Sequence, residues 1–294
     1  MTDDPRWPRA SAWLAQSSVD PIDLAVLGVP CHRTSISATH ADATPQAIRA
    51  ALARYSTYSW AHDVDLADLR VRDLGDVAEP DGPDGEQRVA EAVGAADARL
   101  LIALGGDNSL TFSVMAGRRG DALADSGLIT LDAHHDLRDG VSNGSPVRRL
   151  IEAGLPGSRV VQIGIADFSN SRYYADRARE LGITVITREQ LRRRSMVEAM
   201  AEALAIAGSG KGSIHVDLDV DVCDRSVVPA CPAAAPGGLS ADELREVAYL
   251  AGNSPRVSSI DIAEIDASAD SPDGRTVRLG ALLLLEAAAG LASR

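Results

Sequence analysis

The sequence predicts an α/β fold of three layers, in which a doubly wound, mostly parallel sheet of about eight strands lies between helices. Short apolar runs alternate with longer amphipathic segments along nearly the whole chain. This alternation is typical of parallel strands that are connected by helices. Groups of acidic residues also follow several apolar runs, and open α/β sheets place their chemistry at the carboxyl ends of strands.

The expected elements follow from local patterns. Residues 24–29 form an apolar run that ends at Pro30, and residues 100–104 form another that Gly105 and Gly106 allow to turn sharply. Thr44 as a cap and Pro45 in the first turn predict a helix over residues 45–55. Further strands are expected near residues 71–74, 127–131, 160–165, 183–186, 214–220 and 257–262. Further helices are expected at 86–98, after 107–109, and at 146–152, 171–181, 188–207, 241–251 and 276–291.

Length and composition indicate one large domain. A chain of 294 residues with 45% apolar and 24% charged residues can bury a full core. We expect residues 1–20 to form an irregular N-terminal arm, anchored by Trp7 and Trp13, and residues 21–294 to form a single domain.

Charge and cysteine content limit the partners. The net charge of −13 argues against binding to nucleic acid or to an anionic membrane. Cys31, Cys223 and Cys231 form no disulfide framework, which fits a reducing cytoplasm. The sequence also shows no signal peptide pattern and no apolar run of membrane-spanning length.

One motif at the end of an expected strand has the composition of a metal site. Asp132, His134 and Asp136 follow the apolar run 127–131 at spacings that let all three side chains face one point. Two carboxylates and one imidazole suit Mn²⁺, and suit Zn²⁺ or Fe²⁺ less well. The alternative is a solvated acidic loop.

A second motif supports a metal site. Asp217, Asp219 and Asp221 alternate with Val and Leu, so a strand would carry all three on one face. Three like charges repel one another unless a cation lies between them. An exposed edge strand is the alternative explanation for such alternating polar residues, but the face opposite the aspartates is apolar throughout, which indicates a buried strand. Two acidic clusters at strand ends predict a dinuclear centre that generates a hydroxide nucleophile.

These motifs together resemble the ureohydrolase family, which contains arginases, agmatinases and formimidoylglutamases. The resemblance covers about residues 22–290 and rests on the ordered segments 105–109, 132–136, 219–224, 236–240 and 261–264. It implies an arginase-like fold, a small-molecule substrate, two Mn²⁺ ions and a homo-oligomer, either a trimer or a hexamer.

The resemblance also implies roles for individual residues. One metal would be held by Asn108, Asp132, Asp136 and Asp219. The other would be held by Asp132, His134, Asp219 and Asp221. Asp136 would also hold the bridging hydroxide by a hydrogen bond, and Glu264 would orient the amidino or formimino nitrogen of the substrate.

Two asparagines depart from the family pattern. Asn108 stands where the family usually has His, and an amide oxygen is a weaker ligand for Mn²⁺ than an imidazole nitrogen. We therefore expect the metal next to Asn108 to be bound more weakly. Asn143 stands where arginases and agmatinases carry a His that shuttles protons, so that role is absent or has moved to His135 or a water.

The departures favour a formimidoylglutamase, in which a metal-bound hydroxide would hydrolyse N-formimino-L-glutamate to L-glutamate and formamide. The two substrate carboxylates need cations, and Arg138 and Arg148 are candidates because arginine binds carboxylates in a bidentate manner. Asn143 could also hydrogen-bond a substrate carboxylate. Two alternatives stay open: a guanidino hydrolase that releases urea, and a non-catalytic family member with a decayed metal site. Arg149 is a third candidate, and the alternative is that two of these three arginines are solvated helix residues.

Overall fold

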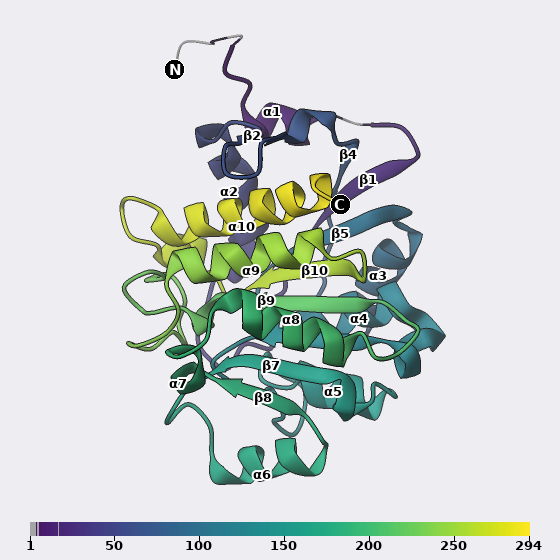
Figure 1. Ribbon diagram of the computed structural model, residues 1–294, viewed down its shortest axis with the longest axis vertical. Coiled ribbons are helices and arrows are strands. Elements are labelled where there is room, and N and C mark those ends of the chain that lie inside the picture. The colour runs from purple at the N-terminus through teal and green to yellow at the C-terminus, as the bar shows by residue number, and fades with distance from the viewer. Residues whose placement is uncertain (1–3, 5, 17) are drawn as a thin grey trace.

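A parallel sheet of eight strands forms the centre of the computed structural model, which describes all residues except 1–3, 5 and 17 (Figure 1). The strands of this sheet are β1 (Ile22–Val29), β4 (Val71–Asp76), β5 (Ala98–Gly105), β6 (Gly127–Leu131), β7 (Val160–Ile165), β8 (Thr184–Thr187), β9 (Ile214–Asp219) and β10 (Val257–Ala263). Their order is β4-β1-β5-β10-β9-β6-β7-β8, and every neighbouring pair is parallel. The predicted fold class is therefore confirmed.

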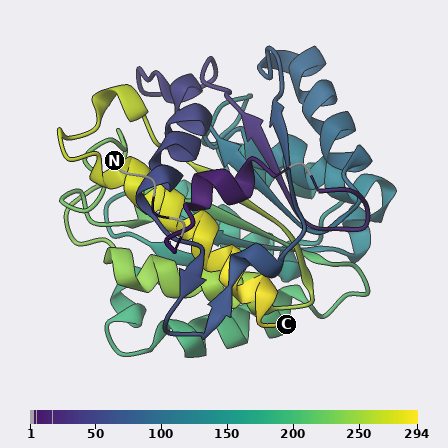
Figure 2. The same cartoon turned by 90° about the horizontal axis from the view of Figure 1, so that it is seen from above.

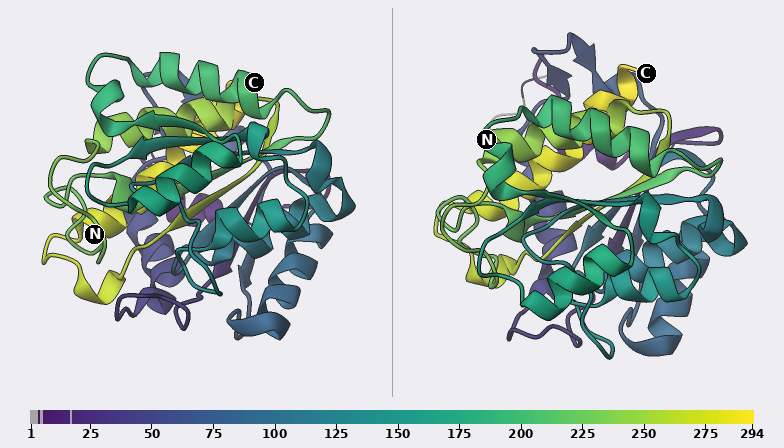
Figure 3. Two further views of the ribbon diagram at one scale, coloured as in Figure 1. Left: turned by 90° about the horizontal axis from the view of Figure 1, so that it is seen from below. Right: turned by 60° about the horizontal axis from the view of Figure 1, so that its bottom comes forward.

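Helices cover both faces of the sheet, as the two perpendicular views show (Figures 1 and 2). One layer contains α2 (Thr44–Ala51), α8 (Met196–Ala207), α9 (Ala241–Asn253) and α10 (Arg275–Ala292). The other contains α3 (Gly82–Ala95), α4 (Leu110–Arg119), α5 (Pro146–Glu152) and α6 (Arg172–Glu180). The views in Figure 3 show the sheet between the two layers.

The core follows from the alternation of side chains along the buried strands. In β5, Leu100 and Ile102 pack in the layer of α10, whereas Leu101 and Ala103 pack in the layer of α3 and α4. The central strands are buried on both faces, which explains why their sequences are continuous apolar runs.

Several elements differ from the sequence-based expectations. Thr44 does not cap a helix but is the first residue of α2, because its hydroxyl donates instead to the backbone carbonyl of Ile265. The helix expected over residues 188–207 is two helices, α7 (Arg188–Leu191) and α8, because Ser195 begins a new helix with its own capping box to Glu198.

The expected N-terminal arm contains a helix, α1 (Ala10–Leu14), whose Trp13 is buried in the core. Trp7, the other expected anchor, is half exposed. The expectation for residues 1–3, 5 and 17 lies outside the described residues. A short hairpin of β2 (Tyr58–Ser59) and β3 (Val64–Asp65) was not predicted. Seven 3₁₀ turns complete the described chain: Ala41–Ala43, Leu52–Arg54, Leu66–Asp68, Gly120–Asp125, Gly157–Arg159, Val220–Val222 and Ala267–Ala269.

No helix in the described part of the chain is both long and apolar enough to cross a membrane.

Candidate metal centre

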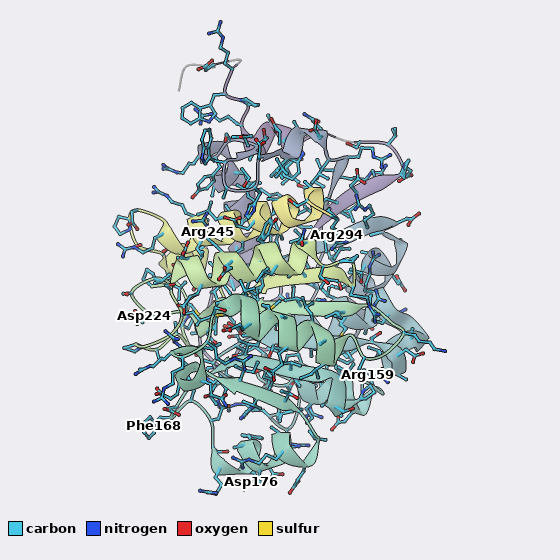
Figure 4. The ribbon with its side chains drawn as sticks, in the orientation of Figure 1. Arg159, Phe168, Asp176, Asp224, Arg245 and Arg294 are labelled. Carbon is cyan, nitrogen blue, oxygen red and sulfur yellow. The ribbon has the colours of Figure 1, made fainter. Side chains whose placement is uncertain are left out.

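The predicted site residues follow the four central strands of the sheet. Asn108 follows β5, Glu264 follows β10, Asp221 follows β9 and Asp132 follows β6, and these four strands are consecutive neighbours. Parallel strands end at the same edge, so the loops after them converge. Figure 4 shows this edge on the left, where Phe168 after β7 and Asp224 after β9 project outward.

Asp132, His134 and Asp221 form the tightest part of the site. Their ligand atoms lie within 4.8 Å of one another. His134 Nδ1 is 2.7 Å from Asp221 Oδ2 and 3.4 Å from Asp132 Oδ1. Asp132 Oδ2 is buried and has no hydrogen-bond partner among the described residues. An unsatisfied buried carboxylate oxygen beside an imidazole and a second carboxylate fits a divalent metal.

The electrostatics of the cluster favour a cation among the carboxylates. Burial and the nearby Asp221 raise the pKa of Asp132 to about 7. Burial and neighbouring carboxylates raise the pKa of Asp136 and of Asp219 well above the usual range. Burial alone would lower the pKa of His134, but hydrogen bonds to Asp132 and Asp221 raise it to about 12. These carboxylates thus stabilise positive charge between them.

Backbone amides fix the orientation of the carboxylates. The N–H of Asp221 donates to Asp219 Oδ1 at 2.8 Å, and the N–H of Ala133 donates to Asp221 Oδ1 at 3.0 Å. The N–H of His134 donates to Asp132 Oδ1 at 2.6 Å. Each loop therefore holds one of its own acids in place, and the loop after β6 also holds Asp221 of the loop after β9.

The expected strand carrying three aspartates is shorter than predicted. β9 ends at Asp219, and Asp221 lies in the 3₁₀ turn Val220–Val222. Asp221 therefore reaches Asp219 through this turn and not through strand alternation, and its N–H donates to the Asp219 side chain. Asp217 is fully buried in the sheet behind the site.

Asn108, which was expected to ligate one metal, hydrogen-bonds Asp136 as a donor. Its Nδ2 donates to Asp136 Oδ2 at 2.7 Å, and its Oδ1 accepts from the Thr111 hydroxyl at 2.9 Å. Its backbone N–H donates to Glu264 Oε1 at 2.8 Å. Asn108 thus connects the two acids that the sequence analysis assigned to catalysis.

Asn143 also contacts Glu264. Its Nδ2 donates to Glu264 Oε1 at 2.9 Å, and its Oδ1 accepts from the N–H of Ile36 at 3.1 Å. Both donors therefore bind Oε1, and no donor among the described residues is bonded to Oε2. Glu264 lines the cavity, so Oε2 is available to an N–H group of a substrate. Burial raises the pKa of Glu264 to about 7, against the effect of the hydrogen bond from Asn143.

Both assigned catalytic acids have a strained backbone. Asp136 (φ +52°) and Glu264 (φ +65°) are two of the five non-glycine residues with positive φ in the described chain. Such conformations cost energy and concentrate at functional sites. Glu264 is held there because its N–H donates to Gly106 O at 2.9 Å. Gly106 must be glycine, since an added Cβ would lie 1.8 Å from Cys31 O.

A cavity of about 320 Å³ opens over these residues. Asp136, Asp219, Asp221 and Glu264 contribute carboxylates to its wall, and Arg138 and Asn143 also line it. The loop 166–171 after β7 closes another side through Ser169, Asn170 and Ser171.

Arg148 is not brought into the cavity. Its guanidinium donates to the carbonyls of Arg138 and Gly140 and forms an ion pair with Glu152. The expected substrate contact is thus replaced by a structural one, because Arg148 lies on α5 and reaches back across the preceding loop. Arg149 is not solvated either, because its guanidinium pairs with Glu86 at 2.7 Å and lies over the Phe112 ring.

Sequence reasoning missed the polar residues that hold His135. Its Nδ1 lies 2.7 Å from Gln162 Oε1, and its N–H donates to Asn170 Oδ1 at 3.0 Å. Gln162 is the single polar residue of the apolar strand β7, and a polar residue at such a position predicts a buried hydrogen-bond partner. Burial lowers the pKa of His135, which lines the cavity.

The fold and the acidic centre together define a metal-dependent hydrolase. The chain belongs to the Arginase family, whose model matches residues 22–290. It is similar to the formimidoylglutamase of Halalkalibacterium halodurans, with 36% identity over 263 residues that cover 83% of this chain and 80% of that protein.

Solved structures agree with this assignment. The formimidoylglutamase from Bacillus subtilis aligns with a TM-score of 0.92 and 31% identity, covering 99% of this chain and 94% of that one. The Trypanosoma cruzi formiminoglutamase, solved with Mn²⁺, aligns with a TM-score of 0.89 and 25% identity, covering 98% of this chain and 99% of that one.

Proposed function

We propose that the protein is a formimidoylglutamase, which hydrolyses N-formimino-L-glutamate to L-glutamate and formamide. The observation that carries this proposal is the Asp132, His134 and Asp221 cluster at the same sheet edge as Glu264, whose carboxylate two asparagines hold at the cavity wall. The similarity to formimidoylglutamases supports the same substrate.

The metal ligands are proposed as follows. One Mn²⁺ would be held by Asp132, His134, Asp219 and Asp221, and the other by Asp132, Asp136 and Asp219, next to Asn108. When bound, the two ions supply a nucleophile at neutral pH and stabilise the charge that develops during hydrolysis.

The chain's own residues orient the substrate. Glu264 Oε2 accepts a hydrogen bond from the imino nitrogen, while the donors on Oε1 keep the carboxylate from rotating. Asp136 is fixed by Asn108 and accepts a hydrogen bond from the attacking water. Addition of water to the formimino carbon and cleavage of its bond to the α-nitrogen release formamide and the free amine of glutamate.

The metal next to Asn108 is proposed to bind more weakly. The Nδ2 group of Asn108, and not its oxygen, faces Asp136, so the amide would have to turn before its oxygen could ligate a metal beside that acid. An amide oxygen is also a weaker ligand for Mn²⁺ than an imidazole nitrogen. Calorimetric titration with Mn²⁺ should therefore show one tight site and one weaker site, and Asn108→His should strengthen the weaker one. Two equally tight sites in the wild-type protein would contradict the proposal.

The function itself is tested by product analysis. Mn²⁺-loaded protein should release formamide and L-glutamate in equal amounts from N-formimino-L-glutamate. Glu264→Gln should lower kcat by about 100-fold, as loss of an electrostatic contact to the reacting group does, with unchanged Mn²⁺ content. Absence of formamide with the wild-type protein would refute the function.

Cellular setting and assembly are also proposed. Cys31, Cys223 and Cys231 are buried free thiols, which supports a cytoplasmic location. The family resemblance supports a trimer or hexamer of identical chains. Trp60, which is 86% exposed on the β2–β3 hairpin, is an apolar surface residue that a second copy could cover. Light scattering that shows only monomer would contradict the assembly.

A further inference from the structure

We propose that Arg138 binds the distal carboxylate of the substrate and thereby selects anionic N-formimino amino acids over cationic guanidino amines. This inference rests on the proposed function, because it assigns the residue that recognises the non-reacting end of that substrate. Four arguments support it: the charges that line the cavity, the ion pairs of the nearby arginines, the packing of Arg138, and the distance of each substrate carboxylate from the reacting group.

The cavity separates charge between its base and its rim. Asp136 and Glu264 at the base are only 6% and 5% exposed, whereas Arg138 is an exposed residue. Arg138 is the one arginine or lysine among the described residues that line this cavity. A substrate with a reacting amidine and a distant carboxylate matches an acidic base and a basic rim.

Neighbouring arginines are neutralised but Arg138 is not. The pairs around this loop are Arg148 with Glu152, Arg149 with Glu86, and Arg177 with Asp139. No acidic partner of Arg138 is present in the part of the chain that the structure describes. In a protein with a net charge of −13, an arginine without an acid beside a cavity is available to an external anion.

The position of Arg138 is built into the loop. Its N–H donates to Gly144 O at 2.9 Å, and its carbonyl accepts from Arg148 Nε at 2.7 Å. Its side chain lies against Gly144, because a Cβ added at Gly144 would be 2.8 Å from Arg138 Cδ. The glycine therefore provides the space through which the guanidinium reaches the cavity rim.

The two carboxylates of the substrate lie at different distances from the reacting group, and only the distal one is expected to reach Arg138. The α-carboxylate is joined to the carbon next to the reacting nitrogen, so it must stay near Glu264 and Asp136. The γ-carboxylate extends two carbons further from the reacting group. Only that group extends toward the rim, where arginine can form a bidentate hydrogen-bonded pair with it.

The test compares two substrates with matched variants. N-formimino-L-glutamate and N-formimino-L-norvaline differ in that a methyl group replaces the γ-carboxylate. Arg138→Gln should raise KM for the glutamate compound about 10- to 100-fold, the range expected for a lost charge-assisted hydrogen bond. It should leave kcat for that compound, and both constants for the norvaline compound, within about threefold. Arg192→Gln, on an arginine paired with Glu189, removes the same charge elsewhere and should change neither substrate.

A second variant keeps the charge. Gly144→Ala should displace the Arg138 side chain and give a smaller loss that is again confined to the glutamate compound. Equal losses of kcat/KM with both substrates in Arg138→Gln, or no loss with either, would overturn the proposal.

Failure of the proposed function would be recognised separately. If the wild-type protein hydrolyses neither compound, the hydrolase assignment fails, and calorimetry with L-glutamate and L-norvaline then decides the role of Arg138. Weaker binding of L-glutamate alone in Arg138→Gln would support it, and unchanged binding of L-glutamate would overturn it.

Discussion

At the scale of single residues, the site depends on two amides that connect its acids. Asn108 binds both Asp136 and Glu264, and Asn143 ties Glu264 to the loop at Ile36. Asn143 was expected to contact a substrate carboxylate, and the structure instead places its donor group on Glu264. An amide that cannot titrate thus serves here to position an acid.

Asn143→Ala tests this positioning role. Glu264 would lose one of its two donors and rotate more freely, so kcat should fall about 10- to 100-fold while the Mn²⁺ content stays the same. Steady-state kinetics with N-formimino-L-glutamate measure the effect. Ser142→Ala, next to it but outside the cavity wall, is the control. Equal kcat values for both variants would show that Asn143 does not position Glu264.

At the scale of elements, the layer formed by α9 and α10 depends on close contact at glycines. A Cβ added at Gly252 of α9 would lie 2.0 Å from Ala287 O of α10, and one at Gly290 would lie 2.2 Å from Tyr249 O. Backbone atoms cannot move aside as flexible side chains do, so larger residues would separate the two helices.

Gly252→Ala should therefore destabilise the fold by about 2 kcal/mol, which lowers the Tm of a chain of this size by roughly 4–8 °C. Gly94→Ala in α3 is the matched control, because its added Cβ would meet Gly117 O at 3.3 Å. The control should gain helix propensity and change Tm little. Differential scanning calorimetry distinguishes the two, and a stable Gly252→Ala variant would contradict the close-contact argument.

At the scale of the whole molecule, the stability of the metal-free protein depends on whether its buried acids and His134 are protonated. The pKa of Asp132 is raised to about 7, so without metal the folded protein keeps a proton that the unfolded chain releases near pH 4. The pKa of His134 is raised to about 12, so above pH 6.5 the folded protein also keeps a proton on His134 that the unfolded chain releases. Stability of metal-free protein must therefore fall as pH rises, because the folded state binds more protons.

Chelator-treated protein should show a Tm that decreases from pH 5 to pH 8. Mn²⁺ should raise the Tm, and the increase should be larger at pH 8, because metal binding competes with these protons. Thermal unfolding with and without Mn²⁺ measures both effects. A Tm of the metal-free protein that stays constant or rises over this interval would show that the acids do not control stability.

The sequence predicted what depends on local pattern. Buried strands such as β5 could be predicted because they are apolar runs. The order of the strands in the sheet could not be predicted, because no local pattern encodes it. The acidic motifs after four strands nevertheless indicated that these strands end at one edge of the sheet. The position of Asp221 in a turn and the engagement of Arg148 with its own loop were not predictable. Both depend on hydrogen bonds to backbone groups that only the folded loops bring close.

The central claim is most directly tested by a substrate comparison. Purified, Mn²⁺-loaded protein should be assayed with N-formimino-L-glutamate, agmatine, L-arginine and 4-guanidinobutyrate, with formamide, ammonia and urea quantified in each reaction. The account predicts formamide and glutamate from the first compound and negligible urea from the other three. Urea from a guanidino compound, without formamide from N-formimino-L-glutamate, would contradict it.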